Sequence, residues 1–503
     1  MSFEVRTGDR GPAALWDGKR LTSAYDAVRE AKTWAEATTC APGALVFVAG
    51  DPLGLASASL AERGFRAVAL LPGADARPWV SPELDAWAPE DGPLEDFLSR
   101  IFETAGPEAV VWQVWPAFER HAADTALEWG RRFRDLYRTV QGSWLTQRRF
   151  GSRFWRNALR NFVDWRHPAQ LVPGNRPLVI AASGPSLDDG LEVLARQRGR
   201  FDLWALPSSF ETLVRLGLTP DAGVATDGGF YAREHLQRLA GTRVPLLAAL
   251  ASAPDPVLAH RPCLFFSQGL AVERALLQGL GTPYPEVPSQ GTVAVTALRL
   301  ALEATSGPVF IAGLDLAFRD LRGHTSPHTV DRRLAGLDHR LTPSEGLWAE
   351  RRFEQATIVR QGTVTSQALW TYALWFQTRA RFSRLVYRIA PSALHWHSMT
   401  EVSWQEAVEH WNAHPGRRSG SWSEVPGRGN RAQRRQQAYD ALAALRDRVE
   451  ASSPDDPWLI ETARTAVPEA LAEDFRDRRQ GRPGASARAA LGPFLAALQE
   501  ELS

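Results

Sequence analysis

Short apolar runs that recur between residues 176 and 391 constrain the fold of this chain more than any other feature of its sequence. Each run has the length and composition of a buried strand, and helical patterns, notably Val293–Glu303, lie between several of them. This alternation predicts a doubly wound α/β domain, whose parallel sheet binds ligands at the carboxyl ends of its strands. The runs are Leu178–Ala182, Phe201–Leu206, Ala222–Thr226, Leu246–Leu250, Cys263–Phe266 and Val309–Gly313.

The N-terminal segment shows the same alternation on a smaller scale. Strand-like runs at Ala44–Gly50, Arg66–Leu71 and Ala109–Val114 accompany the helix-like Leu55–Arg63, which predicts a Rossmann-like unit. The turn Gly50–Gly54 has two glycines where a dinucleotide fingerprint has three, and no ribose-binding acid follows the second run. We therefore expect a Rossmann-like domain without a bound cofactor.

The remaining segments are helical. A Gly/Pro/Arg/Ser-rich linker near 414–431 separates the central segment from amphipathic patterns at Ala432–Glu450, Trp458–Ala472 and Ala485–Leu502. A chain of 503 residues is long enough for two or three domains. We predict an N-terminal Rossmann-like domain over 1–123, connecting helices over 124–170, a central doubly wound domain over 171–395 and a C-terminal helical module over 396–503.

Lysine is nearly absent, and this limits the chemistry of the chain. Only Lys19 and Lys32 are lysines, so the other 56 of the 58 basic residues are arginines. Neither lysine lies in a G-x-x-x-x-G-K-[ST] loop, which excludes a Walker-type nucleotide site, and arginine cannot form a Schiff base. The net charge of +1 gives no global field that favours nucleic acid or an anionic bilayer as a partner.

The cysteines and the apolar segments indicate the cellular compartment in which the protein is expected. Cys40 and Cys263 form no C-x-x-C pair and lie beside strand-like runs, so we interpret them as buried, unreactive thiols. The first residues lack the apolar region of a secretory signal, and no run of about 18 apolar residues occurs in the sequence. We expect a cytoplasmic protein that is not inserted in a membrane.

The strongest candidate for a binding loop is the segment Leu178–Asp188, a buried strand followed by small residues and a helix start. Gly184 would let the backbone approach a ligand, Pro185 suits a first helical turn, and Ser183 or Ser186 supplies a hydroxyl where helix amides converge. This arrangement fits a nucleotide phosphate. A plain strand-to-helix cap, formed by serine, is the alternative interpretation.

Two carboxylates follow other strands of the predicted sheet. Asp227 comes directly after the run at 222–226 and precedes two glycines, a position suited to hold Mg²⁺ or the hydroxyls of a sugar. Its alternative role is a cap of the next helix, and Asp221 is expected to be structural. Asp315 follows the run at 309–313, and His324 in the loop after it is a candidate general base, ahead of His328.

A third helix start carries polar residues. Ser289, Gln290, Gly291 and Thr292 open the helix Val293–Glu303, where their hydroxyls and amides would receive a carboxylate or a second phosphate. The sequence thus predicts hydroxyl-bearing helix starts and carboxylates at one edge of the sheet, a combination that suits a nucleotide-activated donor.

The order of these motifs resembles that of the motility-associated factor (Maf) family of flagellin glycosyltransferases. The motifs are G-P-S-L-D at Gly184, G-L-T-P-D with V-x-T-D ending at Asp227, S-Q-G-T-V-A from Ser289 and G-L-D-L-A-F from Gly313. Upstream, Ser23–Ala31 and Arg149–Asn157 resemble two further motifs of that family. The core of the family is identified as a 6-hydroxymethylpterin pyrophosphokinase MptE-like domain, and it is also similar to bacterial sialyltransferases.

The resemblance implies an inverting glycosyltransferase that moves a nonulosonic acid from its CMP ester to serine or threonine of flagellin. By the likeness to sialyltransferases, Gly184, Pro185 and Ser186 would lie against the nucleotide, while Ser183 and Ser208 stand where those enzymes have asparagine. Asp227 and Asp315 would position the sugar or a metal. No tightly bound cofactor is expected, although Mg²⁺ would suit Asp227.

Two other functions remain open from the sequence. The same pocket would allow an enzyme that uses ATP and Mg²⁺ to pyrophosphorylate a pterin alcohol, although the large flanking segments favour a macromolecular acceptor. A flagellar assembly factor without catalytic activity is the third hypothesis.

Overall fold

The computed structural model describes residues 2–8, 11–289, 291–354, 357–378, 382, 386–390, 392, 394–396, 398–418, 421–424, 429–482 and 484–502. The chain divides into two compact units. The first comprises Met1–Ser152 and Arg446–Ala497, and the second comprises Arg153–Leu445 and Leu498–Ser503. The four-part division expected from the sequence stays a prediction, and each unit is described here by itself.

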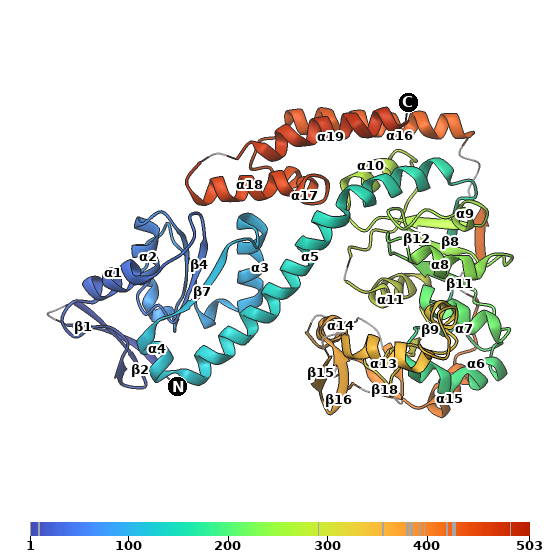
Figure 1. Cartoon of the computed structure of the whole chain (residues 1–503), viewed down its shortest axis with the longest axis horizontal. Helices are drawn as coiled ribbons and strands as arrows, with labels where there is room; N and C mark the ends of the chain where they lie inside the picture. The colour runs from blue at the N-terminus through green and yellow to red at the C-terminus, as the bar shows by residue number, and fades with distance from the viewer. Residues whose placement is uncertain are drawn as a thin grey trace. The chain divides into compact units, whose positions relative to one another are not determined.

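The first unit contains a four-stranded parallel sheet of order β6-β5-β4-β7. The central strand β4 (Leu45–Ala49) is buried along its whole length, as expected for a parallel strand that helices cover on both faces. Helices α1 and α2 lie on one side of the sheet and α3 on the other (Figure 1). The other elements are β5 (Arg66–Leu70), β6 (Asp85–Trp87), β7 (Val110–Val114), α1 (Ala27–Ala37), α2 (Leu55–Glu62), α3 (Leu94–Ala105), α4 (Pro116–His121) and a small antiparallel sheet of β1 (Phe3–Gly8), β2 (Gly11–Trp16) and β3 (Lys19–Arg20).

The C-terminal helices are α16 (Arg431–Ala451), α17 (Pro457–Ala466), α18 (Pro468–Arg479) and α19 (Ser486–Leu502). The single helix predicted over Trp458–Ala472 is in fact two, because Pro468 cannot donate the hydrogen bond that would continue α17. Helices α17 and α18 belong to the same compact unit as the N-terminal residues. The segment predicted to connect the domains is one long helix, α5 (Ala123–Asp164), with residues in both units.

The second unit is built on an eight-stranded sheet in which every neighbouring pair is parallel, in the order β13-β12-β11-β10-β9-β14-β17-β18. All six predicted runs form strands of this sheet, and two more strands, β17 (Val386–Ile389) and β18 (Thr400–Val402), extend it. The predicted strands are β9 (Leu178–Ala181), β10 (Asp202–Ala205), β11 (Ala222–Ala225), β12 (Leu246–Ala249), β13 (Cys263–Phe266) and β14 (Val309–Ala312).

The direction of winding reverses between β9 and β14. Strands β10 to β13 continue the sheet on one side of β9, whereas β14, β17 and β18 continue it on the other. Because Leu178 pairs with Val309 and Ala181 with Ala312, both strands end at the same level. Parallel sheets open a crevice at such a switch point, at the carboxyl ends of the strands.

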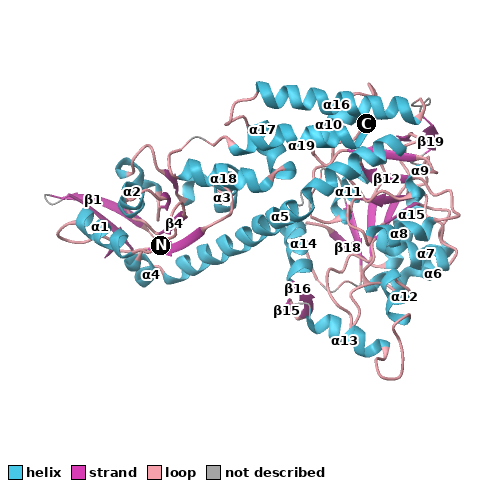
Figure 2. Cartoon of the chain, turned by 45° about the horizontal axis from the view of Figure 1, so that its top comes forward, coloured by secondary structure: helices cyan, strands magenta, loops and turns pink. Residues whose placement is uncertain are grey.

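Helices cover both faces of this sheet (Figure 2). Helices α11 (Val293–Ala304) and α14 (Gln367–Thr378) share one apolar core with Leu178, Ile180 and Trp204, while Phe210 of α7 meets Gly223 on the other face. The remaining elements of the unit are α6 (Leu191–Arg196), α7 (Phe210–Arg215), α8 (Ala232–Leu236), α9 (Pro256–Ala259), α10 (Ala271–Gln278), α12 (Thr329–Ala335), α13 (Ser344–Glu354), α15 (Trp404–Ala413) and the pairs β8 (Ala169–Val172) with β19 (Ser421–Glu424) and β15 (Thr357–Arg360) with β16 (Thr363–Ser366).

Two sequence expectations concern single features of this fold. None of the helices in the described part of the chain has the length and apolarity that a bilayer crossing requires. Cys263 is buried, and burial raises the pKa of its thiol, as expected for an unreactive cysteine. Cys40 is only half-buried, because it lies in the loop after α1 rather than inside the sheet.

Candidate active site

The polar residues predicted from the sequence follow strands that are neighbours in the second unit. Ser183 follows β9, Ser208 follows β10, Asp227 follows β11, and Asp315 follows β14. Since β11, β10, β9 and β14 are adjacent and parallel, these residues all lie at the carboxyl edge of the sheet, around the switch point.

Three of the predicted side chains form a hydrogen-bonded row. The Ser208 hydroxyl donates to Ser183 Oγ over 2.6 Å, and Ser183 Oγ lies 3.3 Å from His324 Nδ1. The row joins the loops after β10, β9 and β14. The Thr325 amide also donates to the Ser183 carbonyl over 2.8 Å, which holds the histidine loop against the end of β9.

His324 belongs to a group of three histidines. Its ring is stacked on that of His328, with centroids 4.4 Å apart, and the ring of His235 on α8 lies 5.3 Å from that of His328. His235 Nδ1 is 3.0 Å from the Thr329 hydroxyl, and burial lowers the pKa of His235.

The Gly184 loop is fastened by Asp315. The Asp315 carboxylate is 5% exposed and accepts the Ser186 amide over 2.7 Å, while the Gly184 amide donates to the Gly313 carbonyl. A Cβ on Gly184 would lie 2.4 Å from Asp315 Oδ2, so the missing side chain makes room for the carboxylate. Burial raises the pKa of Asp315, and its hydrogen bonds to Ser186 oppose that rise.

The segment after Gly184 differs from the predicted helix start. The segment after Gly184 is a six-residue 3-10 helix, Pro185–Gly190, rather than a full α-helix, and its Ser186 amide is already bonded to a carboxylate of the protein. A phosphate would have to compete with Asp315 for that amide. The hydroxyls of Ser183 and Ser208 are therefore better placed than the amides of Gly184 and Ser186 to contact a phosphate.

Asp227 is exposed at the carboxyl end of β11. Its Oδ1 accepts the Gly229 amide over 2.7 Å, and its charge contributes to raising the pKa of Tyr372 on α14, after the larger effect of burial. Among the described residues, no group of three or more His, Cys, Asp or Glu side chains is placed to hold a metal ion. Asp227 would offer Mg²⁺ a single carboxylate.

The third predicted helix start is formed as expected. Thr292 caps α11, with its side chain accepting the Ala294 amide, and Ser289 is exposed. Gly291 has a φ of 83°, and a Cβ there would lie 3.6 Å from the Tyr372 ring. Gln290 lies outside the described residues. Tyr372 therefore lies beside the α11 start, although no sequence motif singled it out.

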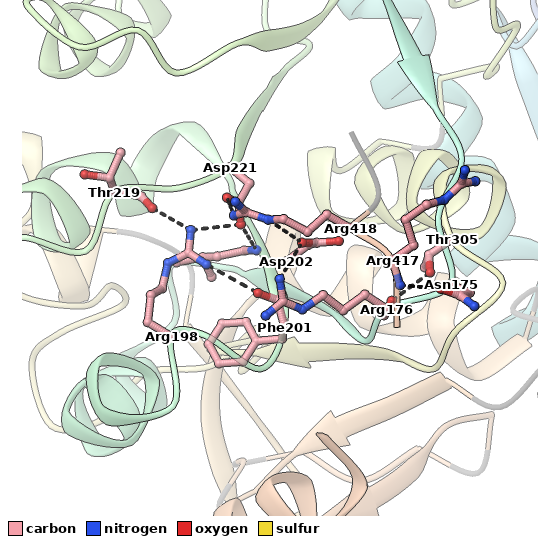
Figure 3. Close-up of polar contacts among 11 residues, drawn as sticks. Asn175, Arg176, Arg198, Phe201, Asp202, Thr219, Asp221, Thr305, Arg417 and Arg418 are labelled. Atoms are coloured by element: carbon pink, nitrogen blue, oxygen red, sulfur yellow. Dashed lines mark hydrogen bonds and ion pairs between the residues drawn. The ribbon is translucent and has the colours of Figure 1, made fainter. Parts of the chain in front are cut away.

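Ion pairs hold the amino ends of β10 and β11, at the other end of these strands from the candidate site (Figure 3). Asp221, expected to be structural, precedes β11 and pairs with Arg198 over 2.8 Å and with Arg418. Buried Asp202 pairs with Arg418 over 3.5 Å and with Arg176 over 3.7 Å. These contacts join Arg418 to the amino ends of β10 and β11, whereas Asp227 follows the carboxyl end of β11.

A cavity of about 580 Å³ lies elsewhere in the second unit. It is bordered by the edge strand β13 and the start of α16, and none of the predicted site residues lines it. Its lining includes Trp165, Phe265, Tyr284, Gln433 and Gln437 and no charged side chain, so it offers a phosphate no ion pair.

Comparison with known proteins gives a family match for part of the second unit. Residues 156–321 match the model of a family described as 6-hydroxymethylpterin diphosphokinase MptE-like. They form an MptE-like domain. This domain includes Ser183, Ser208, Asp227 and Asp315, whereas His324 and Tyr372 lie beyond its end.

Two further comparisons cover more than the MptE-like domain. An uncharacterized protein of Treponema pallidum (strain Nichols) is 27% identical over 240 residues, which are 48% of this chain and 50% of that protein, so the match spans about half of the relative's length. The structure of a MAf glycosyltransferase from Magnetospirillum magneticum AMB-1 matches with a TM-score of 0.55 and 14% identity, covering 100% of this chain and 87% of that chain. The two chains share a fold. Together with the MptE-like domain, this likeness confirms the family resemblance of the motifs.

Proposed function

We propose that the chain is a glycosyltransferase that moves a nonulosonic acid of the pseudaminic or legionaminic type from its CMP ester to serine or threonine of flagellin. The row Ser208–Ser183–His324 at the switch point carries this proposal, because it joins hydroxyls suited to a phosphate with a base suited to a hydroxyl nucleophile. The MptE-like domain, the fold shared with a protein described as a MAf glycosyltransferase and the order of the motifs support it.

The hydrogen bonds suggest how His324 would act. Ser183 Oγ accepts from Ser208, and its second lone pair would accept an Nδ1–H of His324. In this tautomer, Nε2 is the basic nitrogen of the imidazole, and the Ser183 proton is left to donate to a phosphate oxygen. The base and the phosphate contact would then be coupled through one hydroxyl.

The proposed reaction is a displacement at the anomeric carbon of the donor. The acceptor hydroxyl oxygen attacks this carbon while the bond from the carbon to the phosphate oxygen breaks and CMP leaves with the electron pair. His324 takes the proton of the acceptor hydroxyl, and Ser183, which Ser208 holds in place through its hydrogen bond, donates to the departing phosphate. Attack opposite to the leaving group inverts the configuration.

The other candidate residues take supporting roles in this proposal. Asp227 would hold hydroxyl or amide groups of the sugar, and the α11 start at Ser289, Gly291 and Thr292 would receive its carboxylate. Asp315 and Pro185 shape the Gly184 loop. We derive no step through Mg²⁺, because Asp227 is one carboxylate without described companions. We further propose that the N-terminal unit with its C-terminal helices holds the acceptor protein, in the cytoplasm.

Nucleotide binding separates this proposal from its alternative, an ATP-dependent pterin pyrophosphokinase, which the description of the matched family favours. We expect CMP and CTP to raise the melting temperature of the protein, because the donor site recognises a cytidine nucleotide, and ATP and GTP to have little effect. A thermal-shift series with the four nucleotides, with and without Mg²⁺, measures this. A shift with ATP alone would favour the kinase, and no shift with any nucleotide would favour a non-catalytic assembly factor.

The placement of the sugar at Asp227 gives a second test. Asp227→Ala should lower the rate of transfer at least tenfold without changing the unfolding midpoint, because the side chain is exposed and accepts only the Gly229 amide among the described contacts. Asp221→Ala, at the other end of the same strand, is the control: it should destabilise the protein and leave the rate of the folded enzyme nearly unchanged. Full activity of Asp227→Ala would refute this placement.

A further inference from the structure

Helix α5 carries two asparagines that bind the loops at the carboxyl ends of β11 and β12. Asn157 and Asn161 lie four residues apart and therefore on one face of the helix, and each is 4% exposed. The Asn157 side-chain amide donates to the carbonyls of Gly228 and Ala251, over 3.1 and 3.2 Å. The Asn161 amide donates to those of Leu250 and Ser252, over 2.9 and 2.8 Å.

The four carbonyls lie where the sheet ladder ends. A buried carbonyl beyond the last strand residue has lost its ladder partner, and leaving it without a hydrogen bond is costly. A side-chain amide has two N–H donors, and each asparagine uses both of them on such carbonyls. The two side chains thus fix both strand-end loops to one rigid helix.

Of the two asparagines, only Asn157 donates a hydrogen bond to the loop that carries Asp227. Gly228 is the residue after Asp227, and it also packs so closely on Phe154 of α5 that a Cβ would lie 2.6 Å from the ring. The Asp227 carbonyl also accepts the Ala253 amide of the loop after β12, over 2.9 Å. The backbone around Asp227 is therefore held by α5 and by the β12 loop, while its carboxylate accepts the Gly229 amide.

We propose that Asn157 is the positioning residue for Asp227: it holds the β11 loop at the distance from the donor sugar that transfer requires. This inference rests on the proposed role of Asp227 in sugar binding. A displacement of a catalytic contact by about 1 Å is enough to reduce a rate by about 100-fold, so a clamp one residue away controls catalysis without touching the substrate.

Asn161 provides a matched control for Asn157. It has the same chemistry, burial and number of hydrogen bonds on the same helix, but its two carbonyls both belong to the β12 loop. Alanine at either position removes two hydrogen bonds to buried carbonyls, so the two variants should lose similar amounts of stability. Their effects on the site should differ.

The experiment compares Asn157→Ala and Asn161→Ala in the full chain. We expect Asn157→Ala to lower kcat for transfer from a CMP-sugar at least tenfold, with a smaller change in KM, and to speed hydrogen exchange of the Gly229 amide. Asn161→Ala should keep kcat within about threefold and leave that exchange slow. Equal losses of kcat in both variants, or wild-type kcat in Asn157→Ala, would overturn the proposal.

Two additions keep the test decisive. If Asn157→Ala does not fold, Asn157→Ser retains one donor and should show an intermediate rate and an intermediate exchange at Gly229. If the wild-type protein transfers no sugar, the proposed function fails. The positioning of the Asp227 loop by Asn157 is then tested by the Gly229 exchange in the asparagine variants alone.

Discussion

Replacement of His324 by alanine is expected to lower kcat for sugar transfer by about 100- to 10,000-fold, the range that a positioned general base contributes. The reason is the row that ends at its Nδ1: in the proposed tautomer Ser183 orients the ring and leaves Nε2 as the base, and the other two members of the row are serines. Donor binding should change little, since the Ser183 and Ser208 hydroxyls remain.

The measurement is a pH profile of kcat for the wild type and for His324→Ala. A histidine base is inactive once it is protonated, so the wild-type rate should fall as the pH is lowered. The variant should lack this acidic limb. His260→Ala, an exposed histidine after α9, is the control and should keep the wild-type profile. An acidic limb that persists in His324→Ala would assign the base to another group.

Replacement of Arg479 by leucine is expected to destabilise the first unit by about 1–3 kcal/mol for each buried carbonyl that loses its hydrogen-bond donor. Arg479 is 5% exposed at the end of α18. Its guanidinium donates to the carbonyls of Gly43, Ala105, Gly106 and Glu108. Leucine would leave these carbonyls without that donor.

Denaturant unfolding of the full chain measures this effect. Arg482→Leu is the matched control, because Arg482 is exposed, lies three residues further on and makes only a surface pair with Asp477 over 2.7 Å among the described contacts. Such pairs contribute about 1 kcal/mol or less. If Arg479→Leu unfolded at the same denaturant concentration as Arg482→Leu, α18 would not be a structural part of the N-terminal unit.

The strands of the central sheet show where sequence reasoning works and where it stops. All six apolar runs form strands, because parallel strands covered on both faces must be apolar along their length. Strand β17 was not predicted, because Arg388 interrupts its apolar pattern. This arginine is buried, and its charge is accommodated over the Trp396 ring, 3.8 Å from its centroid, and by Glu401 at 3.6 Å. These partners come from a later part of the chain, so no local pattern reveals them.

The candidate site was also predicted only in part from the sequence. The sequence by itself determined which residues end the strands, since hydroxyls and carboxylates that follow apolar runs must lie at the carboxyl edge of a parallel sheet. Only the tertiary structure decided which of them meet. Ser186 and Asp315 are 129 residues apart and bond because β9 and β14 are neighbours, and Ser208, Ser183 and His324 join for the same reason. Strand order depends on long-range packing, which a local pattern does not encode.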